Sequence, residues 1–441
     1  GSRLAGILLS SDSANEIIFG FGERLEIDTA EITTYDDYEY DFNTIPFWLA
    51  EKTMSNIYRY ERSEEECYSY TASVRIGILD ILLKSLGKEV PSPTIAEFLL
   101  GYDVQDPTIK SIQQSSIATD KRARLACLLS ILSMVKTGID TEDDEQPTLI
   151  QTHPVLAEKC YQLIYKLCAR ESTSGITLQY LRGGDDFMLK QFQAITCRLE
   201  SCVSVVEPNF AGELISADQT RVKTDYLTLA SVLNQRAWLL KLIALDLHQL
   251  AGTPLASEST ELLNLMFGIS SDDSTSLTDK LKAMQLVSGT EHGYQQPLWN
   301  LVEIINSLDF TWIDQLDDTA QKNATFSYFE GFDAKKHLVK KSGGYEMYDI
   351  RNIYKTLRQY QLTDPSVKNL SEQDRTNMES EMGAILKQLM ADNRHREISY
   401  GRLHCLRAWK QVVEIAISDC FECFSFEARE RIIYDLLNAL L

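Results

Sequence analysis

Two stretches of the sequence are apolar on nearly every face that a helix would present. Residues 125–135 are interrupted only by Ser130 and Ser133, and residues 238–247 hold just two charged side chains. A surface helix needs only one apolar stripe, so a helix that is apolar all round is stable where neighbours cover it on both sides. The sequence therefore predicts inner helices of a layered helical array. Neither stretch reaches the roughly 20 apolar residues that a membrane-spanning helix needs.

One local pattern recurs along most of the chain: a capping residue, apolar residues at helical spacing, then a glycine. Ser63 and Glu66 form one such capping box, and Gly87 supplies the left-handed stop. The apolar residues recur with a period of about 3.6, which indicates α-helices and not strands. Helices are predicted from Ser63 to Gly87, from Ser92 to Gly101, from Thr119 to Val135, from Pro154 to Leu167, and over residues 185–199, 216–250, 258–267, 275–287, 298–308, 346–360, 371–392, 397–423 and 425–441.

The predicted fold class is all-α, because strand signals are short and few. The number of helices, their length and their short connections favour an extended α-solenoid of stacked helix pairs, with an acidic loop-rich N-terminal stretch. No exact repeat supports this architecture, so a large irregular helical bundle stays open as the alternative. We divide the chain into residues 1–62, an acidic loop-rich segment with the start of the solenoid, and residues 63–441, a continuous helical solenoid with a linker signal near residues 139–150.

The chain is strongly acidic, with 64 Asp and Glu against 43 Lys and Arg and a formal net charge of −21. This balance argues against nucleic acid as a partner, because Lys and Arg supply most of the affinity for phosphate backbones. Residues 26–41 hold seven acids and no base, a composition that predicts a solvated loop. The opening Gly1 and Ser2 read as an expression remnant, and the apolar last residues 432–441 indicate a piece of a longer polypeptide.

Nine cysteines are scattered without a regular framework, which indicates reduced thiols in a nuclear or cytosolic compartment. Cys420 and Cys423 lie three residues apart, and Cys405 lies upstream of them. A continuous helix over this region would hold Cys405 well over ~20 Å from Cys423, which is too far for a zinc site. We interpret these cysteines as buried helical thiols and predict neither a metal nor a cofactor.

The common motifs of catalysis and nucleotide binding are absent. The sequence contains no G-x-x-x-x-G-K-[ST] phosphate loop, no H-E-x-x-H and no G-x-S-x-G. Asp185 and Asp186 follow two glycines and are better explained as first-turn acids favoured by a helix dipole than as a catalytic pair. We therefore predict a protein without enzymatic activity and without a small-molecule substrate.

Aromatic residues gather in the second half of the chain. Phe310, Trp312, Phe329 and Phe332 either belong to the core or line a groove for a segment of a partner protein, and they are our candidate partner-binding residues. The lysine-rich segment 334–341 follows directly. It is either a solvated loop before a glycine pair, or an import signal or polyanion patch.

Three segments resemble one known family. Residues 153–168 (HPVLAEKCYQLIYKLC), 173–182 and 233–248 are similar to the middle region of the very large scaffold nucleoporins of the inner ring of the nuclear pore complex. Residues 400–413 are similar more weakly. Together these segments cover about a hundred residues, and the similarity elsewhere is diffuse.

The resemblance implies a karyopherin-like superhelical stack of HEAT and armadillo-like helix pairs at the nuclear pore complex of the nuclear envelope. Such a protein would be a structural strut that catalyses no reaction and is not inserted in a membrane. It would bind short segments of disordered linker nucleoporins and support nucleocytoplasmic transport of protein and mRNA. It would use Leu156, Leu163 and Ile164 to seal a helix pair, and Arg182 and Arg236 to anchor turns. A transport-receptor-like solenoid that binds cargo or Phe-Gly repeats is the alternative, and an enzyme with a dispersed site is a third.

Overall fold

The computed structural model is predominantly helical. It describes residues 7, 14–25, 70–87, 90, 93–102, 127–139, 148–183, 187–194, 212–224, 226–251, 257–269, 300–314, 327–341, 343–363 and 371–440. The α-helices in this part of the chain are α2 (Ala14–Leu25), α6 (Tyr70–Ser85), α7 (Ile95–Leu99), α8 (Cys127–Lys136), α9 (Leu149–Thr152), α10 (Pro154–Ala169), α11 (Ser174–Arg182), α12 (Phe187–Gln193), α13 (Tyr226–Leu250), α14 (Ser257–Met266), α16 (Leu301–Asn306), α17 (Ile350–Thr363), α19 (Glu372–Asp419) and α20 (Phe426–Leu440).

Two small antiparallel sheets accompany the helices. The larger has the strand order β2-β1-β3, and the smaller pairs β4 with β5. In the larger sheet, Leu214 lies opposite Val222 on one side and Trp312 on the other. The strands are β1 (Gly212–Ser216), β2 (Arg221–Thr224), β3 (Phe310–Asp314), β4 (Leu338–Lys340) and β5 (Glu346–Tyr348), and the 3-10 helices are η3 (Ala334–His337) and η4 (Phe421–Cys423).

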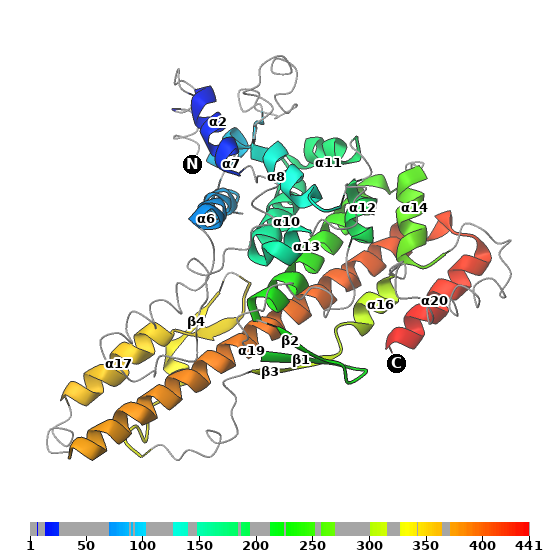
Figure 1. Ribbon diagram of the computed structural model, residues 1–441. Coiled ribbons are helices and arrows are strands. Elements are labelled where there is room, and N and C mark those ends of the chain that lie inside the picture. Colours follow the sequence, from blue (N-terminus) through cyan, green and yellow to red (C-terminus); the bar gives the residue numbers. More distant parts are fainter. Residues whose placement is uncertain are drawn as a thin grey trace, which may run out of the picture.

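The longest element, α19, runs through the length of the molecule (Figure 1). Its 48 residues correspond to about 72 Å of helix. Ser371 caps its N-terminus, where the serine hydroxyl accepts a hydrogen bond from the Asp374 N–H at 3.1 Å. The C-terminal half of α19 packs against α13, while the N-terminal half packs against α17 and extends away from the other helices (Figure 1).

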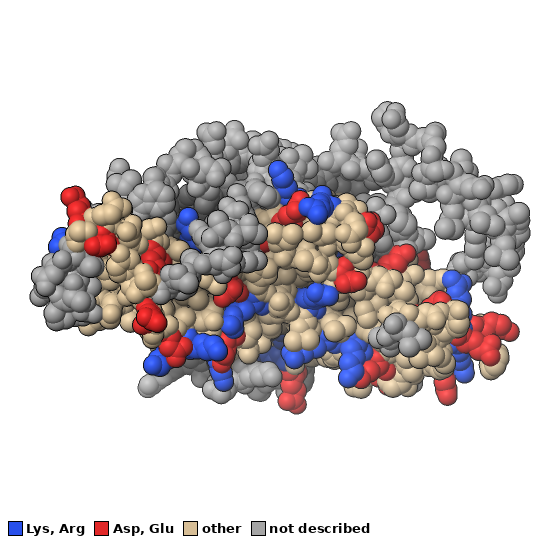
Figure 2. Space-filling model, turned by 90° about the horizontal axis from the view of Figure 1, so that it is seen from below, with Lys and Arg blue, Asp and Glu red and all other residues tan. Residues whose placement is uncertain are grey.

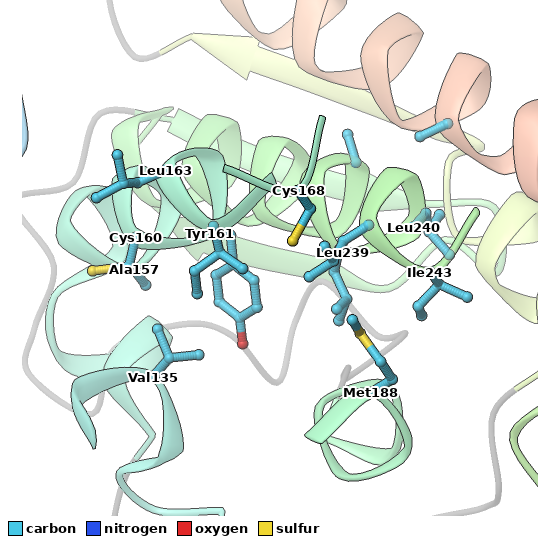
Figure 3. Packing of buried hydrophobic residues seen from close by; sticks show 14 of the residues in the cluster. Val135, Ala157, Cys160, Tyr161, Leu163, Cys168, Met188, Leu239, Leu240 and Ile243 are labelled. Carbon is cyan, nitrogen blue, oxygen red and sulfur yellow. The ribbon is translucent and has the colours of Figure 1, made fainter. Parts of the chain in front are cut away.

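The inner helix predicted over residues 238–247 is confirmed, because α13 is covered on both sides. It packs against α10 on one side and α19 on the other. Leu239 and Ile243 are fully buried, and Figure 3 shows them near Cys168 of α10 and Met188 of α12. The second stretch that is apolar all round also lies in the core, since most residues of α8 are buried. The fully buried Leu156, Leu163 and Ile164 of α10 belong to the same core.

A second hydrophobic core lies between α17 and the N-terminal half of α19. It holds Ile353 and Leu357 from α17 and Met378, Met382 and Leu386 from α19. The structure therefore divides the packing along α19 between a large core at its C-terminal half and a small one at its N-terminal half. We call the paired helices around the second core the α17–α19 arm.

The strands correct the all-α prediction. The helix predicted over residues 216–250 begins only at Tyr226, because β1 ends at Ser216 and a hairpin turn follows. Ser216 and Gln219 resemble a helix cap in the sequence, but they belong to this turn: the Gln219 N–H donates to the Ser216 carbonyl at 2.9 Å, and Gln219 has a positive φ of 68°. The residue types that start helices also make turns, which explains the error.

Other predicted helices are confirmed with changed ends. The break predicted between residues 392 and 397 is absent, because α19 continues through it. The helix predicted from residue 346 begins at Ile350, after β5. The cap at Ser63 and Glu66, the acids Asp185 and Asp186, and the helix over residues 275–287 lie outside the described residues. None of the described helices combines the length and apolarity that a membrane crossing requires.

The buried face of α10 gives a first testable prediction. Leu163→Asp places an unpaired charge at a side chain with 0% exposure, so we expect the free energy of unfolding to fall by several kcal/mol. Ile81→Asp is the matched control, because Ile81 is 50% exposed and the same charge stays in water. Thermal unfolding followed by circular dichroism measures both. Equal melting temperatures for the two variants would show that the face assignment of α10 is wrong.

Candidate interaction surfaces

The contact between α13 and α19 is the most extensive between any two described helices. It is close because α19 carries Gly401 where the two backbones approach each other. A Cβ atom at this position would lie 3.2 Å from the Leu233 Cβ and 3.5 Å from the Ala230 carbonyl oxygen. The absence of a side chain at Gly401 therefore sets how near the two helices lie.

A buried histidine fixes the register of the same two helices. His404 Nε2 lies 2.8 Å from Lys241 Nζ, and His404 Nδ1 lies 2.9 Å from Asn234 Oδ1. An ammonium group only donates, so Nε2 accepts from Lys241 and Nδ1 carries the proton that is donated to Asn234. Burial, followed by the charges of Lys241 and Arg407, lowers the pKa of His404 to about 3. The imidazole is therefore neutral and bonded at both nitrogens.

Aromatic rings continue this contact to both sides. Tyr400 stacks on His404 with 5.6 Å between the ring centroids. Trp238 makes a T-shaped contact with the same imidazole, with 4.5 Å between the centroids. Tyr345 stacks on Tyr400 at 4.4 Å, and Tyr165 of α10 lies 5.2 Å from Trp238. A row of rings thus links α10, α13, α19 and the loop before β5.

A buried ion pair joins the larger sheet to α19. Arg394 donates from Nε to Asp314 Oδ2 at 2.5 Å and from Nη2 to Asp314 Oδ1 at 2.9 Å. Both side chains are buried, and the guanidinium also lies over the Tyr226 ring at 5.5 Å. Two parallel bonds between planar groups fix both distance and angle, so this pair orients β3 on α19.

The two arginines that the resemblance assigns to turns have different partners. Arg236 is 1% exposed and donates to the hydroxyl of Ser307, which caps the C-terminus of α16. Arg182 pairs with Asp246 at 2.7 Å, and Asp246 lies within α13. The first arginine therefore holds a helix end, and the second ties α11 to the side of α13.

The structure divides the four candidate aromatic residues between the two cores. Phe310 and Trp312 lie on β3, are each 7% exposed and belong to the large core. Arg402 of α19 covers the Phe310 ring at 5.3 Å. Ile313 points to the other face of the strand and is 42% exposed.

The other two candidates belong to the α17–α19 arm. Phe329 is 5% exposed and lies 5.8 Å from the Tyr360 ring. Phe332 is partly buried and stacks on His337. The four side chains therefore do not form one surface, and their role in partner binding stays a prediction.

The lysine-rich segment is a structured hairpin and not a loop. Its lysines lie on η3 and β4, or directly after them, and Lys335, Lys336, Lys340 and Lys341 are exposed. Asn393 of α19 fastens the hairpin by accepting from the Tyr348 N–H at 2.7 Å and donating to the Tyr348 carbonyl at 2.9 Å. An extended peptide signal would need this backbone to leave the sheet.

Cys420 and Cys423 lie where α19 ends and η4 begins. Cys420 is buried, Cys423 is exposed, and both thiols are free. Burial raises the pKa of Cys405 and of Cys420 to about 11 each, so both thiols are protonated. Within the described ranges, no group of three or more His, Cys, Asp or Glu side chains could hold a metal ion.

The sequence prediction missed an apolar surface on α20. Phe426, Ile433, Tyr434 and Leu437 are 69%, 45%, 67% and 56% exposed. The apolar residues of α20 recur at helical spacing in the sequence. The spacing alone does not show which of these residues face the core and which face solvent. Figure 2 shows acidic and basic side chains interspersed over the described part of the face seen from below.

These features define the class: a mostly helical protein whose polar groups join helices to one another. The amino-acid comparisons define the family. The whole chain, residues 1–441, matches the Nup192 family, described as "Nuclear pore complex scaffold, nucleoporins 186/192/205". The chain belongs to this family of structural, non-enzymatic nucleoporins of the nuclear pore complex.

Two curated relatives are similar over most of the chain. The human nuclear pore complex protein Nup205 is 24% identical over an alignment of 388 residues, gaps included, and the alignment covers 85% of this chain and 17% of the relative. The NUP205 protein of Arabidopsis thaliana is 26% identical over an alignment of 392 residues, gaps included, and the alignment covers 82% of this chain and 19% of the relative. The chain thus spans less than a fifth of the length of these relatives.

The ion pair on β3 gives a second prediction. Asp314→Ala leaves Arg394 buried without its carboxylate, and we expect the free energy of unfolding to fall by about 3–5 kcal/mol. Glu414→Ala breaks the exposed pair with Lys410 on the same helix and should cost at most about 0.5 kcal/mol. Urea unfolding of both variants measures the difference. Equal losses would contradict the role of the buried pair.

The neutral histidine gives a third prediction, which concerns pH. Between pH 6.5 and about 3 the unfolded imidazole binds a proton that the folded one does not, so stability is lost as the pH falls through this window. His404→Gln removes the group, and its melting temperature should therefore fall less than that of the unmodified chain between pH 7 and 5. An imidazole NMR resonance of His404 that titrates near pH 6.5 would disprove the assignment.

Proposed function

We propose that this chain is a rigid helical strut of the inner ring of the nuclear pore complex. The match of all 441 residues to the scaffold nucleoporin family carries this proposal. The described packing supports it, because α6, α10, α13 and α19 each contact the next in that order. An element that is buried against neighbours on both sides transmits force between them, because close-packed protein interiors have low compressibility.

The proposed architecture is an extended α-solenoid of stacked HEAT and armadillo-like helix pairs. Residues 63–441 would form its continuous part, and residues 1–62 would hold an acidic segment and its start. The position of α2 supports a start of the solenoid within residues 1–62, since α2 packs against α6, α7 and α8 and its Leu25 is fully buried. The linker signal near residues 139–150 would then separate two successive helices of one stack.

The proposed partners are disordered linker nucleoporins, which would bind through short segments and so support nucleocytoplasmic transport. The net charge of −21 favours basic segments by electrostatic steering. Steering acts mainly on the association rate, which therefore depends on salt more strongly than the dissociation rate does.

A fourth prediction tests these partners. The chain is immobilised, mixed with nuclear-envelope extract at low and high salt, and cross-linked before mass spectrometry. We expect recovery of linker or neighbouring scaffold nucleoporins, with more at low salt and with cross-links concentrated on one face. The control is the Leu163→Asp variant under conditions where circular dichroism shows it to be unfolded. Proteins that are captured by this unfolded chain as well do not recognise the fold.

Two outcomes would contradict the proposal. The folded chain recovering no nucleoporin at either salt concentration would remove the proposed partners. In the second outcome, Phe-Gly peptides displace all captured proteins and bind the chain weakly at many sites. This would identify a transport-receptor-like solenoid instead of a strut.

A further inference from the structure

The smaller sheet has one edge that α19 closes. On the outer edge of β5, Asn393 accepts from the Tyr348 N–H at 2.7 Å and donates to the Tyr348 carbonyl at 2.9 Å. Arg396, about one turn further along α19, donates to the Glu346 carbonyl at 3.4 Å. Side chains of α19 therefore occupy the place where a further strand would pair with β5.

The other edge of the sheet, on β4, is not paired with any strand that the structure describes. The Lys341 N–H donates to the Tyr345 carbonyl at 2.8 Å, and these two residues are the next pair in the register of β4 and β5. Bonded pairs alternate along an antiparallel ladder, so Val339 also bonds to β5. The N–H and C=O of Lys340, which lies between them, therefore point to the outer edge of β4.

Four exposed lysines border this open edge: Lys335, Lys336, Lys340 and Lys341. None of them forms an ion pair with an acid among the described residues, and residues 334–341 contain no acid. Asp333 and Asp349, at the two ends of the hairpin, each accept a backbone N–H at the start of a helix. Glu346 lies on β5, so β4 separates it from the open edge. The charge along the edge is therefore positive, although the chain as a whole is acidic.

The open edge and its charge determine the chemistry of a partner. An unpaired strand offers both donors and acceptors, which the backbone of an extended polypeptide matches. A phosphate backbone only accepts hydrogen bonds, and the net charge of −21 repels a long polyanion. A second copy of β4 would bring its own lysines against these. Side chains alternate between the faces of a strand, so Lys340 and Lys341 lie on opposite faces, and a matching strand carries acids on both.

We propose that β4 binds an extended acidic segment of a partner protein as a third strand of the smaller sheet. The backbone of the segment bonds to the N–H and C=O of Lys340, and its acids pair with Lys340 and Lys341. An apolar side chain of the segment covers Val339, which is 48% exposed. The hairpin lies on the α17–α19 arm, at neither the first nor the last of the described helices (Figure 1). This inference goes beyond the proposed function, because the net charge of the chain favours basic segments.

The test uses the 441-residue chain and labelled synthetic peptides of about ten residues, with binding measured by fluorescence anisotropy. One peptide has pairs of glutamates between valine and threonine residues, and a second has lysine in place of each glutamate. We expect the glutamate peptide to bind at least about tenfold more tightly at low salt, with a smaller difference at high salt.

Backbone methylation distinguishes strand pairing from attraction between charges. Two further glutamate peptides carry N-methyl groups at every second residue, in one phase or in the other. A strand bonds to its neighbour through alternate residues, so one phase should abolish binding and the other should preserve it.

Variants of the chain locate the site. Lys340→Glu combined with Lys341→Glu should weaken the glutamate peptide at least about tenfold. Lys84→Glu combined with Lys410→Glu, which reverses two exposed lysines of α6 and α19, should leave it unchanged. Lys340→Pro and Lys340→Ala remove the same charge, but only proline removes the N–H at the open edge, so binding to Lys340→Pro should be about threefold weaker. Circular dichroism checks that each variant folds.

Several results would overturn the inference. These are equal binding of the glutamate and lysine peptides, binding of neither, equal binding of the two methylated peptides, or equal affinity of Lys340→Pro and Lys340→Ala. Since the peptides are synthetic, recovery of no nucleoporin from the extract would contradict the proposed function and leave this inference intact.

Three other occupants of the edge would also overturn it, and each has its own signature. A single-stranded oligonucleotide that displaces the glutamate peptide at equal concentration would identify a polyanion patch. A dimer of the chain that Lys340→Pro makes monomeric would identify a second copy. Tighter peptide binding after Asp36→Asn and Asp37→Asn would show that the acidic stretch of this same chain competes for the edge.

Discussion

The close contact of α13 with α19 is the constraint on which the rest of the described structure depends. Gly401 lets the two backbones approach, and His404 fixes their register through Asn234 and Lys241. Because α13 is covered by α10 on its other side, the same contact sets the position of the helices that pack on α10. Arg394 of α19 pairs with Asp314 of β3, so the position of the larger sheet is also set by α19.

Buried polar groups give this packing its specificity. Apolar contacts can be remade in more than one arrangement of two helices, whereas a bonded histidine or a two-point ion pair is satisfied in one register only. The buried ion pair of Arg394 with Asp314 and the buried His404 each join one element to another. This arrangement suits a protein whose function is to hold its shape, and it agrees with membership in a scaffold family.

Helical periodicity predicted most helices, since apolar spacing reports directly on which face is buried. It could not predict the larger sheet, because Ser216 and Gln219 are equally suited to a cap and a turn, and because β1 and β3 acquire their pairing only from residues about a hundred positions apart. The candidate aromatic residues show a second limit. Composition placed Phe310 and Phe329 in one cluster, but β3 and the α17–α19 arm carry them into separate cores.

The contact between α13 and the C-terminal half of α19 should make these helices one cooperative unit, and hydrogen exchange of the 441-residue chain tests this most directly. Backbone amides of residues 229–247 and 398–416 should exchange slowest and at matching rates, because both helices must open together. The α17–α19 arm, with its separate small core, should exchange faster. Slow exchange in the arm, with early exchange in the two central helices, would contradict the account.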